Sequence, residues 1–508
     1  MAYHIDPENG DIVLDGFDKG VADDPYSGLG DISQCSIAVP NEISVGYTIT
    51  ANATSGATLG IPIARSTRFF NYGTPGIPAG TSAQSFAIVD KTGQVFEATS
   101  YAGTWTFLAN GNTTISATTN IGLAYWLGYL WKFQGVEVYY WNNTVWAKLS
   151  TTSAGYTITT DVPHFAYVAS DNVLYFTNNG YVGSITAPTP TAFDPTNTAT
   201  YSFSNTKLQL PVTDVALSLA EVGGGNAPQS TLLIGGSQNA IYPWDKVSSS
   251  FNLPIYIAET YIGRMVSVNQ NAFIFPGNQN GRGRIYITNG SQANLYFKIP
   301  DFITTEQEPY FVWGDAIYHR NNLLFGFVPF QNSGSSDTGV ANDNVWAIDL
   351  DTKVFRPVSI LPSASLKGNA NCLISLGSVS SPGFGYIVGW DDRGSVPSIG
   401  YSGTVAGIGG ATFNTDLIPI GTLLNPKTTA QIEFKVRTPL RSGESIAITA
   451  FNNSGNSTVL STIVGGAVGD ISGYYTSTVE KSQWLGLRVS IVGNSATGGG
   501  RLYEIRIR

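Results

Sequence analysis

Charged residues are scarce in this chain of 508 residues. Asp, Glu, Lys and Arg together make up 12% of it, whereas about 25% is usual in globular proteins. Phe, Trp and Tyr make up a further 12%. Disordered chains combine high charge with few aromatic residues, and coiled coils require repeated heptads, so both classes are excluded. The 57 glycines and 25 prolines indicate frequent turns, and the composition as a whole predicts an all-β protein.

Cysteine and histidine are rarer still. Cys35 and Cys372 are the only cysteines, and a disulfide scaffold needs more of them, so we expect two separated thiols. The three histidines, His4, His164 and His319, lie far apart in the sequence. A metal site or a histidine-based catalytic site would therefore require distant segments to converge. We expect neither a metal nor a cofactor.

Long apolar runs and a signal peptide are also missing. No stretch approaches the roughly 18 uninterrupted apolar residues that suggest a membrane span. The start, Met1–Glu8, has neither a basic segment nor an apolar core. These features predict synthesis in a cytosol without membrane insertion. The most apolar stretch, Leu123–Phe133, predicts a buried strand.

The net charge is −9, and the basic residues are not clustered. Arg282 and Arg284 form the densest basic run, whereas a nucleic-acid-binding surface needs many such residues together. A general nucleic-acid-binding role is therefore not expected. A mild acidic excess instead keeps an assembly soluble and prevents DNA from adhering to it.

Sequence motifs of catalysis are missing as well. The chain contains no Gly-x-Ser-x-Gly elbow, no phosphate-binding loop and no His-Glu-x-x-His pair. A glycosidase needs two carboxylates on either side of a sugar, and Glu306, Glu308, Asp391 and Asp392 are candidates. A chain with 35 acidic residues offers such candidates without any catalytic role. We expect a non-enzymatic protein, with a polysaccharide-degrading enzyme as an alternative.

Tyr139, Tyr140, Trp141 and Trp146 form the densest aromatic group. Exposed aromatic rings could stack on sugars, but sheets that are buried on both faces also need large side chains to fill the core between them. Core packing is the favoured interpretation, and glycan binding is the alternative.

A similar unit recurs between residues 45 and 405. Each unit has an apolar strand, a short break, a strand rich in Tyr, Val, Ile and Trp, and a polar turn. The turn residues are Asp90, Asn142, Asn178, Asp245, Asn289, Asp349 and Asp391. Their mean spacing, (391 − 90)/6, is about 50 residues, in the range of propeller blades. We predict a β-propeller of about six to seven blades, in which these residues end the third strand; a series of unrelated β-sandwiches is the alternative.

The C-terminal segment, residues 406–508, contains longer alternating strands. Gln431–Arg437 places apolar residues on one face and charges on the other. In the last strand, Tyr503, Ile505 and Ile507 are predicted to face the core. This pattern predicts a β-sandwich.

Residues 1–44 contain too few apolar residues for a core of their own. We expect an extended N-terminal arm that lies across another surface. Phe17, Pro25 and Tyr26 are the candidate partner-binding residues within it.

Several segments resemble virion proteins of tailed bacteriophages. They are Asp15–Gly20, Asp24–Tyr26 and Pro40–Val45 near the start, Leu217–Asp245 and Arg284–Gly290 in the repeats, and Leu417–Arg508 at the end. The chain is similar over nearly its whole length to the β-propeller nozzle and adaptor proteins of short-tailed phages. No catalytic motif is implied by this resemblance.

The resemblance implies a structural tail component that forms a ring through which DNA is ejected. By the same resemblance the ring is a homo-oligomer, a hexamer, and DNA passes through it without specific binding. Its neighbours would be other tail proteins, such as an adaptor ring or fibres. The location would be the tail of the virion, with assembly in the host cytoplasm. A tail protein that recognises host-surface glycans is the main alternative.

Overall fold

The computed structural model consists of β-strands throughout its described part, with one short 3-10 helix, η2 (Pro190–Ala192). The structure describes residues 2–5, 11–16, 31–33, 35–36, 44–45, 47–55, 63–70, 84–90, 93–109, 122–149, 158–159, 164–223, 230–277, 283–299, 311–329, 344–361, 368–376, 385–392, 398–406, 410–414, 418–419, 431–436, 440, 442–452, 457–464, 472–476, 484–493 and 502–507. The prediction of an all-β protein is confirmed.

Four-stranded antiparallel sheets follow one another along the chain from β12 to β27. The first is β12 (Gly122–Trp126), β13 (Tyr129–Gln134), β14 (Glu137–Trp141) and β15 (Trp146–Lys148). The second is β16 (Ala166–Val168), β17 (Leu174–Asn178), β18 (Tyr181–Thr186) and β19 (Ser202–Gln209). The third is β20 (Ala216–Val222), β21 (Thr231–Gly236), β22 (Ala240–Trp244) and β23 (Ile255–Tyr256). The fourth is β24 (Tyr261–Val268), β25 (Asn271–Gly277), β26 (Arg284–Thr288) and β27 (Ala293–Lys298).

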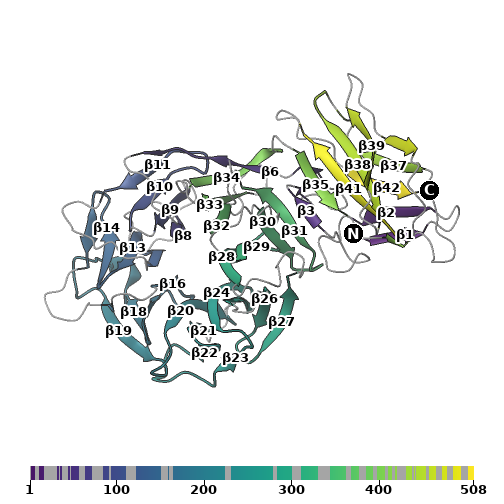
Figure 1. The fold of residues 1–508 in the computed structure, drawn as a ribbon. Helices are drawn as coiled ribbons and strands as arrows, with labels where there is room; N and C mark the ends of the chain where they lie inside the picture. Colours follow the sequence, from purple (N-terminus) through teal and green to yellow (C-terminus); the bar gives the residue numbers. More distant parts are fainter. Residues whose placement is uncertain are drawn as a thin grey trace.

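A further sheet precedes these four. It contains β8 (Ile63–Phe70), β9 (Gln84–Asp90), β10 (Val95–Ala98) and β11 (Trp105–Leu108), and β7 (Thr54–Ser55) adds to β11 in parallel. Figure 1 shows the sheets arranged around a ring, with the first strand of each nearest the centre and the fourth at the rim. This is the arrangement of a β-propeller.

An eight-stranded sheet completes the ring. It contains β28 (Phe311–His319), β29 (Asn322–Pro329), β30 (Asn344–Asp349), β31 (Phe355–Ile360), β32 (Gly368–Ser375), β33 (Tyr386–Asp392), β34 (Ser398–Ala406) and β6 (Tyr47–Ala51). β6 pairs antiparallel with β34 and parallel with β31. A strand from the N-terminal side therefore joins the two meanders β28–β31 and β32–β34, and hydrogen bonds between distant segments hold the ring shut.

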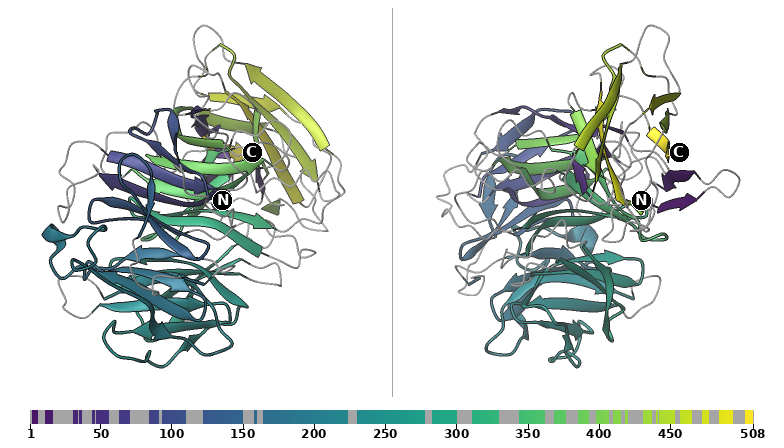
Figure 2. Two further views of the ribbon diagram at one scale, coloured as in Figure 1. Left: turned by 90° about the vertical axis from the view of Figure 1, so that its left-hand side faces the viewer. Right: turned by 45° about the vertical axis from the view of Figure 1, so that its right-hand side comes forward.

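Two more sheets lie beside the ring, next to β31 and β6 (Figures 1 and 2). One has the order β1 (Ala2–Ile5), β2 (Ile12–Gly16), β42 (Leu502–Ile507), β37 (Gln431–Val436) and β40 (Ser472–Thr476). The other has the order β3 (Asp31–Ser33), β35 (Gly410–Asn414), β41 (Trp484–Val492), β38 (Ser445–Asn452) and β39 (Ser457–Val464), with β36 (Ile418–Pro419) on β41. A short pair, β4 (Cys35–Ser36) and β5 (Ser44–Val45), is separate. Both large sheets contribute to one apolar cluster, which also includes Phe355 of the ring.

The alternation predicted in the C-terminal strands is largely observed. Ile432 and Phe434 are buried, as are Ile505 and Ile507. Tyr503, however, is half-buried, and Leu502 takes the buried position. The pairing of β42 with β37 shifts register at this end, and such an irregularity changes the face to which a side chain points.

The described N-terminal residues differ from the extended arm that the sequence predicts. β2 pairs antiparallel with β42, placing Leu14 opposite Ile505, and β3 pairs with β35. Leu14 is buried in the shared apolar cluster. The described strands β1, β2 and β3 satisfy backbone groups by pairing with one another or with the C-terminal sheets.

The predicted turn residues fall at two kinds of position. Asn142, Asp245 and Asn289 directly follow the third strand of a sheet, and Asp349 ends one. Their side-chain oxygens accept hydrogen bonds from the backbone N–H two or three residues later in the chain. Asp90, Asn178 and Asp391 instead lie at or near the end of a second strand, so the prediction was wrong for them. Asp90 accepts a backbone N–H bond within its own turn, from Gln94 at 2.9 Å. The Asn178 side chain instead accepts the backbone N–H of the distant Thr159 at 2.6 Å. Leu123–Phe133 likewise forms a hairpin rather than one strand, turning at Leu127 and Gly128.

Candidate functional site

The residues that the sequence singles out do not gather at one place among the described residues. The candidate partner-binding residues Phe17, Pro25 and Tyr26 lie outside the described residues, as do Glu306 and Glu308. Asp391 and Asp392 belong to β33, but the structure does not describe their side chains.

The aromatic group of the sequence forms part of the core. Tyr139, Tyr140, Trp141 and Trp146 are all buried. The rings of Trp141 and Trp146 pack together, with centroids 5.5 Å apart. Core packing, the favoured interpretation, therefore accounts for these side chains, because a sugar could not stack on them without opening the sheet.

Each of the two described histidine side chains has a polar partner. His164 Nδ1 lies 3.0 Å from the carbonyl oxygen of Thr177, and His319 Nδ1 lies 2.8 Å from the Ser375 hydroxyl. Cys372 is buried. Within the described ranges, no three His, Cys, Asp or Glu side chains group in a way that could hold a metal ion.

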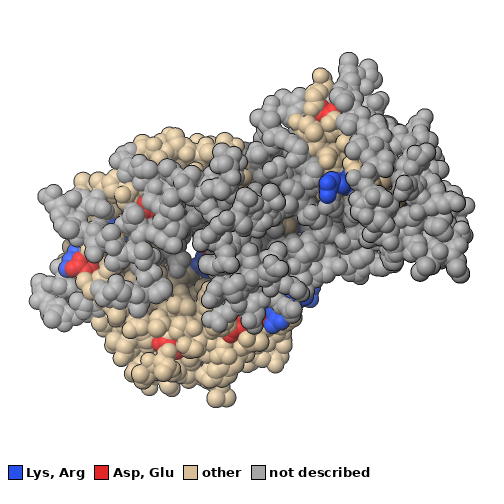
Figure 3. All heavy atoms as spheres, in the orientation of Figure 1, with Lys and Arg blue, Asp and Glu red and all other residues tan. Residues whose placement is uncertain are grey.

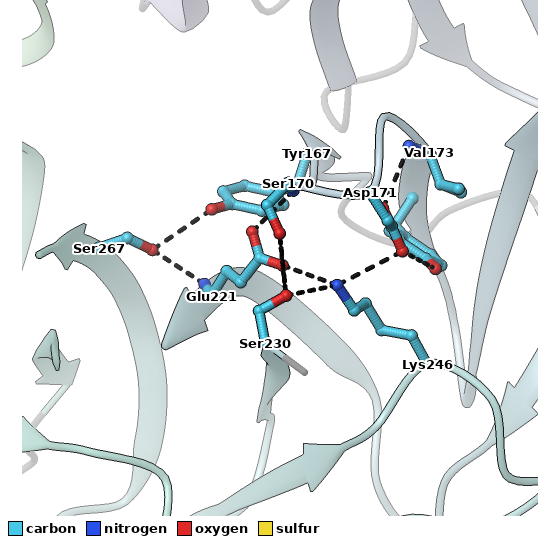
Figure 4. Close-up of polar contacts among 9 residues, drawn as sticks. Tyr167, Ser170, Asp171, Val173, Glu221, Ser230, Lys246 and Ser267 are labelled. Carbon is cyan, nitrogen blue, oxygen red and sulfur yellow. Dashed lines mark hydrogen bonds and ion pairs between the residues drawn. The ribbon is translucent and has the colours of Figure 1, made fainter. Parts of the chain in front are cut away.

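A polar cluster that the sequence did not reveal joins the β16–β19 and β20–β23 sheets (Figure 4). We call it the Glu221 cluster; it consists of Ser170, Asp171, Glu221, Ser230 and Lys246. Ser170 and Asp171 lie in the turn between β16 and β17, and Glu221 lies near the end of β20. Ser230 precedes β21 directly, and Lys246 follows β22 closely. The β16–β17 turn thus approaches three segments of the next sheet.

Glu221 is the acceptor at the centre of this cluster. Its carboxylate accepts hydrogen bonds from the Ser170 backbone N–H (2.8 Å), the Ser170 hydroxyl (2.8 Å) and the Lys246 ammonium (2.8 Å). The Ser230 hydroxyl donates to it as well. Lys246 also lies 3.4 Å from Asp171, and the Glu221 and Lys246 side chains are only 8% and 9% exposed. Glu221 and Lys246 therefore form a buried ion pair, and both side chains have several further polar partners.

A third sheet is attached to the same cluster. The backbone N–H of Glu221 donates to the Ser267 hydroxyl of β24 at 2.8 Å. That hydroxyl lies 3.4 Å from the Tyr167 hydroxyl of β16. Polar contacts therefore tie the innermost strands β16, β20 and β24 together (Figure 4).

The Glu221 cluster contains the residue types of a serine–lysine nucleophile, but its hydrogen bonds do not have the required directions. Lys246 Nζ lies 2.6 Å from the Ser230 hydroxyl, the distance at which a neutral lysine could act as a base. Burial raises the pKa of Glu221, but hydrogen bonds from Lys246, Ser230 and Ser170 outweigh it, and the pKa lies below its ordinary value. Lys246 donates to the Ser230 hydroxyl, and that hydroxyl donates to Glu221, so the serine proton is directed at the carboxylate and not at Lys246. The cluster is therefore suited to clamping sheets together.

A second buried cation joins the β12–β15 sheet to the sheet before it. Lys132 of β13 is fully buried, and its ammonium donates to the Gly93 carbonyl at 3.2 Å. It also lies 4.6 Å from the centroid of the Trp146 ring. Burial lowers the pKa of Lys132 to about 7. The negative charge of Asp90 acts in the other direction and raises this pKa, but by less. Gly93 has a φ of +86°, and a Cβ there would lie 2.1 Å from Gln134 Nε2, so this approach requires glycine.

Side chains from several sheets meet on the central side of the ring, and one contact joins sheets that are not adjacent. Arg264 Nε of β24 lies 3.1 Å from Asp315 Oδ1 of β28. The Arg264 guanidinium carbon also lies 4.8 Å from the centroid of the Phe165 ring, just before β16. Asp315 Oδ2 accepts the backbone N–H of Leu373 in β32 at 2.9 Å. These contacts connect the innermost strands β24, β28 and β32 with the residue that precedes β16.

An acid–tyrosine pair recurs within two neighbouring sheets. Asp214, two residues before β20, accepts a hydrogen bond from the Tyr242 hydroxyl of β22 at 2.7 Å. Glu259, two residues before β24, accepts one from the Tyr286 hydroxyl of β26 at 3.0 Å. Each tyrosine stands three residues before a turn residue of the predicted motif. The spacing of the acids, 28 and 27 residues before the tyrosines, is the signal that sequence reasoning missed.

Tyr242→Phe is expected to lower the free energy of unfolding by about 2 kcal/mol, because it removes one hydrogen bond from a buried carboxylate. Tyr318→Phe, at a partly exposed tyrosine, is the matched control and should change it by less than about 0.5 kcal/mol. Urea unfolding followed by tryptophan fluorescence measures both. Equal effects of the two substitutions would contradict a structural role for the Asp214–Tyr242 pair.

No helix in the described part of the chain has the length and apolar character needed to span a membrane.

Comparison with known proteins identifies similar folds only. The sequence matches no protein-family model, and no curated protein matches it. Among solved structures, the chain is similar to the β-propeller domain of Cps50 (Swd1) from Myceliophteria thermophila, with 11% identity and a TM-score of 0.43 over 70% of this chain and 99% of that one. It is also similar to YCF48 bound to D1 peptide, with 9% identity and a TM-score of 0.42 over 69% and 99%.

An exo-β-1,3-galactanase from Phanerochaete chrysosporium is a third structural neighbour, with 12% identity and a TM-score of 0.30 over 91% of this chain and 99% of that one. With TM-scores below 0.5, these similarities carry no conclusion about activity or partners. The assignment of a β-propeller architecture therefore rests on the sheets of this chain.

Proposed function

We propose that this protein is a non-enzymatic structural component of a bacteriophage tail, a nozzle or adaptor that assembles into a ring through which DNA is ejected. The sequence resemblance suggests the role. The observation that supports it in the structure is the use of buried ionisable groups as clamps between sheets. Glu221, Lys246 and Lys132 all serve contacts between neighbouring sheets, which suits a body that must stay rigid.

We infer a seven-bladed propeller for the body of the subunit. The sheet β8–β11, the four sheets from β12 to β27, and the meander β28–β31 are six blades, and β32–β34 with β6 is the seventh. A seventh blade completed by an N-terminal strand resists opening, because separation requires breaking its hydrogen bonds to β34. The two sheets beside it would form the C-terminal β-sandwich, with N-terminal strands built into it.

The path of DNA would lie between subunits of the assembled ring and not along the axis of one propeller. Arg264 is held on the central side of the propeller by Asp315 and Phe165, and a duplex would have to displace these side chains. A conduit wall that is neutral or acidic lets a polyanion slide. The described surface shows few charged side chains on the face drawn in Figure 3, and the net charge of −9 has the same sign as DNA.

Mass photometry and negative-stain electron microscopy of the purified full chain test this proposal. We expect closed rings of several copies, and no retention of duplex DNA in a gel-shift assay at low salt. A chain that stays monomeric at micromolar concentration, or that binds DNA with a steep salt dependence, would contradict the role of a passive conduit.

A further inference from the structure

A short segment of the chain, residues 47–55, holds three parts of the ring together. Its first strand, β6, pairs antiparallel with β34 and parallel with β31. Its second strand, β7, pairs in parallel with β11. The segment therefore bridges the meanders β28–β31 and β32–β34 and the first sheet of the ring, β8–β11. We call residues 47–55 the clasp.

Asn52 fastens the clasp at the point where β6 gives way to β7. Its backbone N–H donates to the Ile399 carbonyl in β34 at 2.8 Å. Its side-chain amide donates to the carbonyls of Tyr101 and Gly103, in the turn before β11, at 3.0 and 2.7 Å. One residue thus ties the last strand of the ring to the first sheet.

The clasp buries little apolar surface. Among the clasp side chains that the structure describes, only Ile49 is buried; it is 3% exposed and belongs to an apolar cluster with Leu324 and Val388. The exposed residues of the clasp are Thr50, Ala51, Ala53, Thr54 and Ser55. An element that is held by one buried side chain and by hydrogen bonds near solvent belongs to the least stable parts of a fold.

The surface beneath the clasp is shaped at Gly400 in β34. A Cβ at this position would clash with the Thr50 carbonyl oxygen and would lie 2.8 Å from Ile49 Cγ2. β6 can therefore approach β34 only because residue 400 has no side chain. A methyl group at this position would displace the clasp before it displaces any other part of the ring.

Both strands of this joint lead into the sheets beside the ring. β5 ends two residues before β6, and β34 is followed by β35. Upstream, β3 pairs antiparallel with β35, with Ser33 opposite Thr412, so the two segments that meet in the clasp also meet in the neighbouring sheet. The pairing of β6 with β34 is irregular toward this end, between Ser402 and Ala406. Such an irregularity disrupts the ladder of hydrogen bonds, and this end of the joint is its weaker end.

We propose that the clasp is a conformational device that opens as a unit before the rest of the ring, and that the two sheets beside the ring control its opening. A displacement of these sheets pulls β6 and β34 apart at their irregular end, and the separation then spreads past Ile49 to Asn52. Opening removes the strand that joins the two meanders but leaves the meanders folded. These contacts lie within one chain, so the device does not depend on the proposed assembly of subunits.

Hydrogen exchange of the full chain, followed by mass spectrometry, tests this proposal. The Trp105 backbone N–H donates to the Ala53 carbonyl at 2.8 Å, so its protection reports on the clasp. We expect the peptides that contain the clasp and Trp105 to exchange about 100-fold faster than those of β25, which lies inside its sheet. The exchange of the clasp should also depend only weakly on urea, because its opening exposes little surface. Exchange of the clasp and of β25 at one rate, with one urea dependence, would overturn the proposal.

Ile49→Ala removes the buried anchor and should speed exchange of the clasp by about tenfold, with little change in β25. Gly400→Ala leaves Ile49 intact and should have the same effect, so it replaces Ile49→Ala if that variant does not fold. Leu233→Ala is the matched control, because Leu233 is fully buried in the apolar cluster of another sheet and loses the same number of carbon atoms. It should speed exchange of β25 and leave the clasp unchanged. Thermal unfolding checks that each variant is folded, and equal acceleration of the clasp and β25 by Ile49→Ala would contradict a separate opening.

Phe413→Leu tests the control by the neighbouring sheets. Phe413 lies on β35 and is buried in the cluster that these sheets share, and it is not part of the clasp. The substitution should speed exchange of the clasp by about fivefold, because it loosens the strand that continues from β34. A folded Phe413→Leu protein whose clasp exchanges like that of the wild type would show that the clasp opens independently of these sheets, which would overturn their control of it.

Discussion

Glu221→Gln is expected to lower the free energy of unfolding by about 3 kcal/mol, since it leaves a buried ammonium without its main partner. Lys246 would retain Asp171, at 3.4 Å, which is more exposed to solvent than Glu221. The hydrogen bonds from the Ser170 and Ser230 hydroxyls would also be weaker, because the neutral amide oxygen is a poorer acceptor than a charged carboxylate. Urea unfolding at neutral pH, followed by tryptophan fluorescence, measures the change.

Two further variants determine whether the buried charge is responsible. Glu137→Gln breaks an ion pair with Lys148, whose side chain is 51% exposed, and should cost less than about 1 kcal/mol. Glu221→Gln combined with Lys246→Met removes both buried charges and should restore most of the lost stability. A double variant that is less stable than Glu221→Gln alone would contradict this interpretation of the Glu221 cluster.

Lys132→Met is expected to remove a pH dependence of stability that the wild type shows above pH 7. Burial lowers the pKa of Lys132 from 10.5 to about 7 in the folded protein. Between these values the unfolded chain holds a proton that the folded chain has lost, so the stability of the folded state rises with pH. At about 1.4 kcal/mol per pH unit, the wild type should gain about 2–3 kcal/mol relative to Lys132→Met between pH 7 and pH 9.

The matched control for this prediction is Lys148→Met, at an exposed lysine. Its stability difference from the wild type should stay within about 0.5 kcal/mol over the same pH range. Unfolding in urea at pH 6, 7, 8 and 9 measures all three proteins. Below pH 7 the folded protein holds Lys132 as a buried ammonium, and Lys132→Met should then be the more stable protein. A constant difference between Lys132→Met and the wild type across the range would show that Lys132 is charged in the fold at every pH.

Local patterns in the sequence were informative where neighbouring residues decide the structure. Side-chain alternation predicted the buried faces of Ile432 and Phe434 correctly, and turn chemistry located Asn142, Asp245, Asn289 and Asp349. The same patterns failed where pairing geometry intervenes. Tyr503 was assigned to the core, but the register shift between β42 and β37 exposes it partly and buries Leu502.

The clamps could not be predicted because their members are distant in sequence and common in type. Ser170 lies 51 residues from Glu221, and Lys132 lies 39 residues from Gly93. The sequence around a serine, a lysine or a glutamate does not indicate whether that side chain will be buried. Among the described contacts, the Asp214–Tyr242 and Glu259–Tyr286 pairs do have a regular spacing in the sequence, because they repeat in two neighbouring sheets.

The sequence by itself determined that this protein is built of strands, that turns recur at about fifty residues, and that few charges remain for its surface. These properties follow from composition and short-range periodicity, which act within a strand or a turn. Tertiary structure alone decided that β6 joins the last sheet of the ring, that β2 pairs with β42, and that Glu221 and Lys246 form a buried pair. Such contacts depend on which distant backbones come together, and the hydrogen bonds and desolvation that favour them exist only once the sheets have packed.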